Sequence, residues 1–222
     1  MDTQRQLEKM RQDWDDRARV NAEYYVATGN DKWTAEDFFA SGDVTVQNFV
    51  LTDMQNICQG RNPKSMTVLE IGCGVGRLTK SLAGIFGEVY AVDISSEMVA
   101  RARANLQGVP NAHIYQNNGQ DLSVLPPVSI DFAFSCIVFQ HIPSTWIIEN
   151  YIAEVGKRIR PSGLFKFQAQ GAPIEEQPDD TWVGVGISED QAREIAARTG
   201  FEMRYSRGAG TQEYWLWFFR KG

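Results

Sequence analysis

Short apolar runs recur along the last two thirds of the chain, separated by segments with helical periodicity. Five of these runs are short enough for buried strands and lie at 67–71, 88–93, 112–116, 130–135 and 164–169. Two more runs, 201–206 and 213–220, flank a Gly-Ala-Gly loop near the end of the sequence. Strand–helix alternation is typical of a parallel sheet with helices on both faces. The closing pair is expected to be antiparallel, because its connection is short.

Helices are predicted between the strands from apolar residues at three- and four-residue steps. The expected spans are 77–84, 95–105, 145–159 and 188–199, with Ser95 capping the second of them. Pro161-Ser162-Gly163 is expected to end the third helix, and Gly200 the fourth.

The first 62 residues have a different pattern, which predicts helices and no strand. Residues 3–28 place Leu7, Met10, Trp14 and Ala18 on one apolar stripe, and the charged opposite face is interpreted as solvated. A second helix is expected over 43–58. We therefore expect an N-terminal helical extension at 1–62, serving as a cap or lid, and a core domain at 63–222.

Composition narrows the function classes. The chain has 222 residues, a net charge of −6 and a pI near 5, which disfavours nucleic acid as a partner. No apolar run approaches the roughly 18 residues that a membrane span needs, and the first residues lack a signal-peptide pattern. Three scattered cysteines predict neither a disulfide framework nor a metal site, so a cytoplasmic protein without a bound metal is expected.

A glycine-rich loop follows the first strand, with Gly72, Gly74 and Gly76 at every second position. Glycine lets the backbone turn sharply and lets a ligand approach it closely. A dinucleotide-binding fingerprint has the spacing Gly-x-Gly-x-x-Gly, but here Arg77 stands where its third glycine belongs. The spacing predicts a nucleoside ligand that lacks a pyrophosphate.

The segment Glu70-x-Gly72-x-Gly74-x-Gly76 resembles motif I of class I S-adenosylmethionine (SAM)-dependent methyltransferases. The resemblance is to the small-molecule type, related to enzymes of ubiquinone and menaquinone biosynthesis. It implies a Rossmann-like α/β fold with a seven-stranded mixed sheet whose last strand is antiparallel. It also implies SAM as the cofactor.

The family resemblance assigns cofactor contacts to the strand ends. Asp93, 21 positions after Gly72, would accept the ribose hydroxyls, although an Asp there is also a helix cap. Asp121 would accept the adenine amino group, or act as an ordinary turn residue. Glu70 would orient the loop or the methionine end, or serve a purely structural role. The full implied set is Glu70, Gly72, Cys73, Gly74, Gly76, Asp93, Ile94, Gln120, Asp121, Leu122, Ser135 and Cys136.

The methyl acceptor is expected beside the segment that follows the fourth strand, since Ser135–Pro143 resembles the methyl-facing turn of small-molecule methyltransferases. Gln140 and His141 are the candidate catalytic residues. His141 would take a proton from the nucleophile, or would fix the turn before Pro143 as a structural histidine. Candidate acceptor-binding residues are Gln168 and Gln170 on the fifth strand and Tyr24, Tyr25 and Trp33 in the lid.

Three functions remain open from the sequence. The first is a methyltransferase that moves the SAM methyl to an O, N, S or C atom of a small molecule by in-line displacement. The second is a non-catalytic protein of the same fold that binds nucleosides or partners. The third is a nicotinamide oxidoreductase, which the glycine spacing disfavours. The sequence leaves the oligomeric state open.

Overall fold

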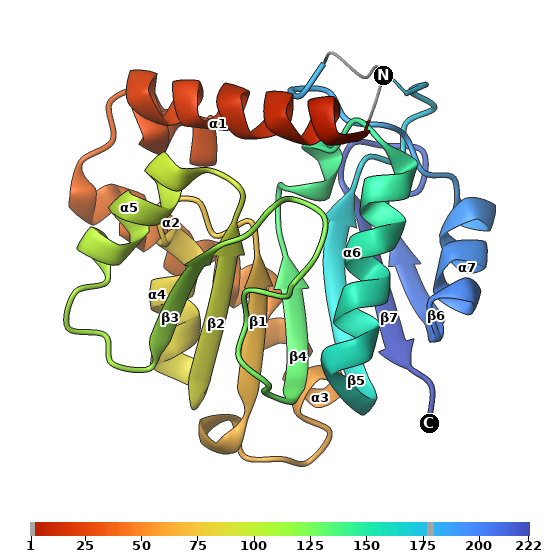
Figure 1. Ribbon diagram of the computed structural model, residues 1–222. Helices are drawn as coiled ribbons and strands as arrows, with labels where there is room; N and C mark the ends of the chain where they lie inside the picture. Colours follow the sequence, from red (N-terminus) through yellow and green to blue (C-terminus); the bar gives the residue numbers. More distant parts are fainter. Residues whose placement is uncertain (1–2, 177–179) are drawn as a thin grey trace. The chain divides into compact units, whose positions relative to one another are not determined.

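The computed structural model describes residues 3–176 and 180–222, and these contain one seven-stranded sheet (Figure 1). The strand order is β3-β2-β1-β4-β5-β7-β6. The strands are β1 (Thr67–Ile71), β2 (Glu88–Asp93), β3 (Ala112–Gln116), β4 (Ile130–Ser135), β5 (Ile159–Ala169), β6 (Phe201–Arg207) and β7 (Tyr214–Arg220). Strand β7 runs antiparallel to both β5 and β6, whereas β1, β2 and β3 pair in parallel. The predicted mixed sheet with a reversed last strand is confirmed.

The helices between strands also agree with the sequence pattern. They are α4 (Arg77–Ile85), α5 (Ser96–Asn105), α6 (Thr145–Arg158) and α7 (Glu189–Arg198). Ser95 caps α5 by accepting a hydrogen bond from Met98 N, as predicted, and Ser188 forms a capping box with Gln191 on α7. One boundary was wrong: β5 begins at Ile159 and includes Pro161-Ser162-Gly163, so these residues do not follow the helix as a loop.

The N-terminal helices differ from the prediction in two places. Helix α1 (Thr3–Val26) is interrupted at Asn21, where φ is −166° and ψ is 88°, and the Asn21 side chain accepts a hydrogen bond from Tyr24 N. The single helix expected over 43–58 is instead α2 (Ala35–Phe49) followed by the short α3 (Met54–Cys58). Thr34 fixes the earlier start, since its hydroxyl accepts from Asp37 N.

The chain divides into two compact units, each described here by itself: residues 11–116, and the described residues up to 10 and from 117 onward. In the first unit, α5 packs on the sheet through Val99, Ala102 and Leu106 against Ala91 and Ile114. Helix α2 approaches α4 closely because Gly42 has no side chain; a Cβ there would lie 2.6 Å from Arg77 O.

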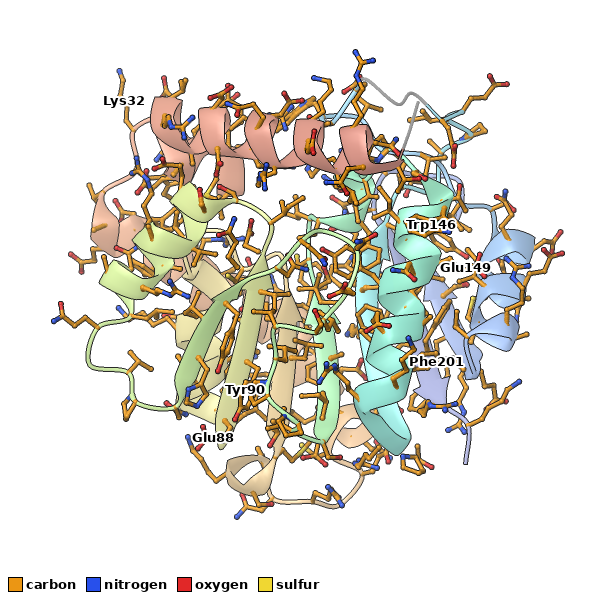
Figure 2. All side chains as sticks on the ribbon, in the orientation of Figure 1. Lys32, Glu88, Tyr90, Trp146, Glu149 and Phe201 are labelled. Carbon is orange, nitrogen blue, oxygen red and sulfur yellow. The ribbon has the colours of Figure 1, made fainter. Side chains whose placement is uncertain are left out.

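The outer strands of this unit carry a ladder of partly exposed rings. Tyr90 on β2 stacks on His113 with ring centroids 4.8 Å apart, and His113 Nε2 lies 2.7 Å from Glu88 Oε2. Figure 2 shows Glu88 and Tyr90 near the start of β2. Arg103 on α5 donates two hydrogen bonds to the Ile114 carbonyl, which protects the edge strand β3 from pairing with another strand.

The second unit has an aromatic core. Phe139, Phe165 and Phe167 pack with centroids 4.6–5.9 Å apart, and Trp215 is 1% exposed. The aromatic run on β7 is therefore a mostly buried strand. In the described part of the chain, no helix is long and apolar enough to cross a membrane.

Candidate cofactor and acceptor site

The loop after β1 needs glycine for its backbone conformation. Gly72, Gly74 and Gly76 have φ angles of 76°, 52° and 88°, a region that residues with a Cβ rarely adopt. Gly76 comes directly before Arg77, the first residue of α4. At Gly74 a Cβ would lie 2.7 Å from Val26 Cγ2, so the end of α1 closes on the loop. The predicted lid segment therefore reaches the glycine loop within this unit.

The backbone amides of the loop are largely occupied. Gly72 N and Cys73 N both donate to Val92 O, at 2.8 and 3.1 Å, and Gly76 N donates to Cys73 O. Gly74 N donates to the Asp93 carboxylate at 2.8 Å. A pyrophosphate site needs several free N–H donors directed at the ligand. These four amides are used within the protein.

Asp93 connects the loop to the start of α5. Its Oδ2 accepts from Gly74 N at 2.8 Å and its Oδ1 accepts from Ser95 N at 2.9 Å. Desolvation raises the pKa of Asp93 to about 6; backbone hydrogen bonds from Ser95, Gly74 and Ile94 oppose that shift, and the charge of Asp15 adds to it. The side chain is only partly buried. A carboxylate has about four acceptor positions, so Asp93 can still accept from a ligand's hydroxyl group besides its backbone donors.

Glu70 lies beneath the loop and is 2% exposed. It accepts a hydrogen bond from Thr79 Oγ1 at 2.6 Å. Desolvation raises the pKa of Glu70 to about 7, the Thr79 hydrogen bond and the nearby Arg77 lower it, and Asp93 raises it further. Two carboxyl groups with raised pKa values therefore flank one loop, an arrangement that favours a cationic ligand over an anionic one.

Asp15 is a residue that the sequence interpretation missed. It was placed on a solvated face of α1, but it is 7% exposed. Its carboxylate accepts from Ser95 Oγ at 2.6 Å, Ser96 Oγ at 3.2 Å and Glu97 N at 3.1 Å. Asp15 thus adds a second cap to α5 and attaches α1 to the turn that contains Asp93. Its partners lie about 80 residues away along the chain, so no local pattern indicates them.

The aromatic residues of the predicted lid segment pack mainly on one another. Trp33 Nε1 donates to Ala27 O at 2.9 Å, and the Trp33 ring lies 5.8 Å from Phe38. Tyr24 and Tyr25 meet edge to face at 5.2 Å and are both partly exposed. Trp33 also packs against a buried cluster of Ala18, Ala22, Phe38, Val75 and Met98, which joins α1 and α2 to the loop and α5.

In the second unit, Asp121 is held inside its own turn. Its Oδ1 accepts from Ser123 N and Oγ at 2.9 and 2.6 Å, and its Oδ2 accepts from Asn118 Nδ2 at 2.7 Å. Desolvation would raise its pKa, but these hydrogen bonds and the charge of Arg158 outweigh it and lower the pKa. Of its sequence neighbours, Leu122 is fully buried, and the Gln120 carbonyl accepts from Asn150 Nδ2. The hydrogen bonds to Asp121 show it acting as a turn residue. Its contact with the adenine amino group stays a prediction.

Asn117, at the end of β3, also escaped the sequence interpretation. It is 5% exposed, and its Nδ2 donates to Tyr151 OH at 2.7 Å and to Asp121 O at 3.3 Å. Among the described residues, its Oδ1 has no hydrogen-bond partner. A buried carbonyl oxygen without a donor is costly, which marks this amide as a candidate to accept a ligand's N–H.

The residues after β4 form a directed chain of hydrogen bonds. Gln168 Nε2 donates to Gln140 Oε1 at 2.6 Å, and Gln140 Nε2 lies 3.1 Å from His141 Nε2. His141 Nδ1 lies 2.5 Å from the Trp182 carbonyl, which can only accept. The proton is therefore assigned to Nδ1, and Nε2 accepts from Gln140.

This arrangement favours the structural alternative for His141. The ring is 5% exposed, and the Trp182 indole covers it at 4.9 Å. Gly184 N donates to Gln140 O, so the turn after β4 is tied to the segment around 182–184. Ser135 at the end of β4 is fully buried and Cys136 partly buried, and Gln170 accepts from Ala172 N. Ile137 has a φ of 59°, which is strained for a β-branched residue, and it is 38% exposed.

The predicted site residues therefore fall into two groups. One joins Glu70, the glycine loop with Cys73, Asp93, Ile94 and the lid aromatics in residues 11–116. The other joins the Gln120–Leu122 turn and the hydrogen-bond chain of Gln140, His141 and Gln168 from residue 117 onward. In the described residues, no three His, Cys, Asp or Glu side chains are clustered for a metal.

One protein-family model matches part of this chain. Residues 68–163 match the family model of a methyltransferase domain. This segment is a methyltransferase domain. It contains the glycine loop, Asp93, Asp121 and the turn with His141, which are the residues that carried the resemblance.

Curated relatives of this methyltransferase domain are distant. A dTDP-3-amino-3,4,6-trideoxy-alpha-D-glucopyranose N,N-dimethyltransferase of Streptomyces venezuelae is 22% identical over 146 residues, covering 65% of this chain and 59% of the relative. A ubiquinone biosynthesis O-methyltransferase of Xanthomonas euvesicatoria is 29% identical over 97 residues, covering 43% and 39%. The chain thus covers less than two thirds of either relative.

Solved structures agree on the fold. The magnesium protoporphyrin IX methyltransferase of Synechocystis PCC 6803, solved with bound S-adenosylhomocysteine (SAH), superposes with a TM-score of 0.62 at 20% identity. The match covers 91% of this chain and 99% of that one. The methyltransferase fold therefore extends well beyond residues 68–163.

Proposed function

We propose that this chain is a SAM-dependent methyltransferase that acts on a small molecule. The observation that carries the proposal is the occupied glycine loop beside two carboxyl groups. With four loop amides already donating within the protein, the loop suits a nucleoside with a cationic or zwitterionic end. Glu70 and Asp93 provide the matching negative charge, because a nearby cation favours their ionised forms. SAM has both a sulfonium and an ammonium group.

The proposed contacts follow from the free acceptor positions. Asp93 would accept from the ribose hydroxyls, with Ile94 beside it. Gly72, Cys73, Gly74 and Gly76 would line the amino-acid end, and Glu70 would stabilise its positive charge through the loop. From the second unit, Gln120, Asp121, Leu122, Ser135 and Cys136 stay proposed cofactor contacts from the family pattern, and Asn117 joins them.

Bound SAM supplies an electrophilic methyl group, so the protein mainly needs to orient the acceptor and exclude water. We propose that His141 and Gln140 act here as positioning residues, because each is held by the other and by a neighbour. Gln168 fixes Gln140, and the Trp182 carbonyl fixes His141. Tyr24, Tyr25, Trp33 and Gln170 remain proposed acceptor-side residues, with residues 1–62 as the lid over the core at 63–222.

The test is calorimetric titration of the full chain with SAM, SAH and NAD⁺, followed by a screen for transfer of a labelled methyl group. We expect SAM and SAH to bind and NAD⁺ not to bind, with transfer to at least one small hydroxyl-, amine- or thiol-bearing acceptor. Tight SAM binding without transfer in a broad screen would favour the non-catalytic alternative. Binding of NAD⁺ in preference to SAM would refute the proposal.

A further inference from the structure

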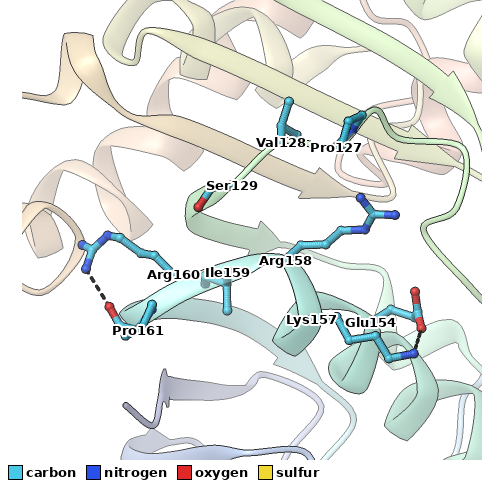
Figure 3. A pocket seen from close by; sticks show the side chains of 9 residues that line it. All are labelled: Pro127, Val128, Ser129, Glu154, Lys157, Arg158, Ile159, Arg160 and Pro161. Carbon is cyan, nitrogen blue, oxygen red and sulfur yellow. Dashed lines mark hydrogen bonds and ion pairs between the residues drawn. The ribbon is translucent and has the colours of Figure 1, made fainter.

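A hollow lies in the unit from residue 117 onward, beside the first residues of β5 (Figure 3). Gln168 of the acceptor set lies near the other end of that strand. The hollow has a volume of about 560 Å³, within the range of small-ligand sites. It is built from the loop before β4, the last turns of α6 and the first residues of β5. None of its lining residues belongs to the proposed cofactor or acceptor sets. The lining consists of Pro127, Val128, Ser129, Glu154, Lys157, Arg158, Ile159, Arg160 and Pro161.

The hollow is basic, although the whole chain has a net charge of −6. Lys157, Arg158 and Arg160 line it together with a single acid, Glu154. Lysine and arginine in the last turn of α6 complement the negative end of the helix dipole, which explains two of the three cations structurally. Arg160 lies on β5, beyond the end of the helix, so the helix dipole does not account for its presence.

Two of the cations form ion pairs, and Arg160 is the one that its neighbours fix. Arg160 Nε lies 3.0 Å from Asp131 Oδ1, and these side chains are 15% and 12% exposed. Its Nη1 donates to Pro161 O at 3.0 Å. Lys157 forms an ion pair with Glu154, which leaves its ammonium group exposed at the rim. The fixed guanidinium of Arg160 would lose little conformational entropy on binding an anion, although Asp131 offsets part of its charge.

Arg158 has unused donors. Within the described residues, its guanidinium makes one hydrogen bond, from Nη1 to Pro126 O at 3.3 Å. A guanidinium has five N–H donors, arranged in a planar fork that matches phosphate oxygens. Figure 3 shows the Arg158 side chain extended across the hollow, between Val128 and Lys157. Its partly buried position lowers the local dielectric and strengthens its pull on an anion.

The remaining walls are apolar. Pro127, Val128, Ile159 and Pro161 surround the cations, and Ser129 adds a hydroxyl group. An anion with an apolar body can contact both the cations and the apolar walls. A doubly charged phosphate is attracted more strongly by the cations than a singly charged carboxylate is. We propose that this hollow binds the phosphate group of a small phosphate monoester with an apolar body, with Arg158 as the principal contact. The proposal does not rest on the proposed cofactor contacts, although the charge of Arg158 also acts on Asp121.

The test uses phenyl phosphate as the probe, titrated into the full chain and followed by calorimetry or NMR shifts, with phenol as the uncharged comparison. We expect saturable binding of phenyl phosphate and none of phenol. R158A should weaken it by at least about tenfold, since a charged hydrogen-bonding partner is lost. The matched control is R193A on α7, whose exposed guanidinium pairs with Glu189 and lies outside the hollow.

S129E provides a second variant, since it adds a negative charge at an exposed rim position without removing a contact of Arg158. It should also abolish binding while leaving SAH affinity unchanged. The proposal is overturned if phenyl phosphate does not saturate at millimolar concentrations in low salt. Equal affinity in the wild type, R158A and S129E would also overturn it.

Discussion

Replacing Glu70 by glutamine should make the ligand-free protein less sensitive to pH. The buried carboxyl has a pKa of about 7 in the folded protein against an ordinary value of 4.5, which corresponds to about 3 kcal/mol. A raised acid pKa means that the folded state binds the proton more tightly than the unfolded state does. The free energy of unfolding therefore falls as pH rises from 4.5 through 7. Between pH 5 and 8 this group should remove about 2 to 3 kcal/mol of stability.

Glutamine keeps the shape and still accepts from Thr79 Oγ1, but it does not ionise. The assay is urea unfolding of ligand-free wild type and E70Q at several pH values between 5 and 8. The difference between them should grow with pH in favour of E70Q, while E36Q, which removes an exposed carboxylate, stays parallel to wild type. If wild type and E70Q lose stability in parallel over this range, the assignment of a buried Glu70 with a raised pKa is refuted.

Three further substitutions test the packing around the site. G74A should destabilise the protein by about 1–3 kcal/mol in thermal unfolding and weaken SAH binding, because φ is 52° and the new Cβ would meet Val26; an unchanged melting temperature would contradict this. D15A should cost about 2 kcal/mol, since the Ser95 hydroxyl and the start of α5 lose an acceptor; a urea midpoint equal to that of wild type would show that this cap is dispensable. H141A should lower the free energy of unfolding by about 1–3 kcal/mol in urea, because the Trp182 carbonyl loses its buried hydrogen-bond donor, but it should keep the affinity for SAH. A variant as stable as wild type would argue against the positioning role.

Local sequence signals were sufficient for much of the fold. The bounds of β1 to β4 are confirmed because each strand is a short apolar run that ends at glycine, aspartate or another polar residue. The closing antiparallel pair followed from its short glycine-containing loop. The errors lie where local signals conflict. Thr34 starts α2 although no apolar periodicity precedes it, and Pro161 lies within β5 although proline usually ends an element.

The candidate site shows a similar division. Asp93 and the glycines were predictable because strand, turn and helix follow one another within about 30 residues of chain. Asp15 and the chain from Gln168 through Gln140 to His141 were not, since their partners meet only through tertiary packing. Asn117 gave no signal either, because its hydrogen bond to Tyr151 of α6 forms only through tertiary packing.

The most direct test of the central claim is the affinity of SAH for D93N compared with S95A. Both variants disturb the turn after β2, since Asp93 accepts from Ser95 N and the Ser95 hydroxyl caps α5. Only D93N removes the carboxylate that we propose grips the ribose. The account predicts that calorimetry gives at least about a tenfold loss of affinity for D93N, from the charged acceptor it removes, and little loss for S95A. Equal affinities in D93N, S95A and wild type would contradict it.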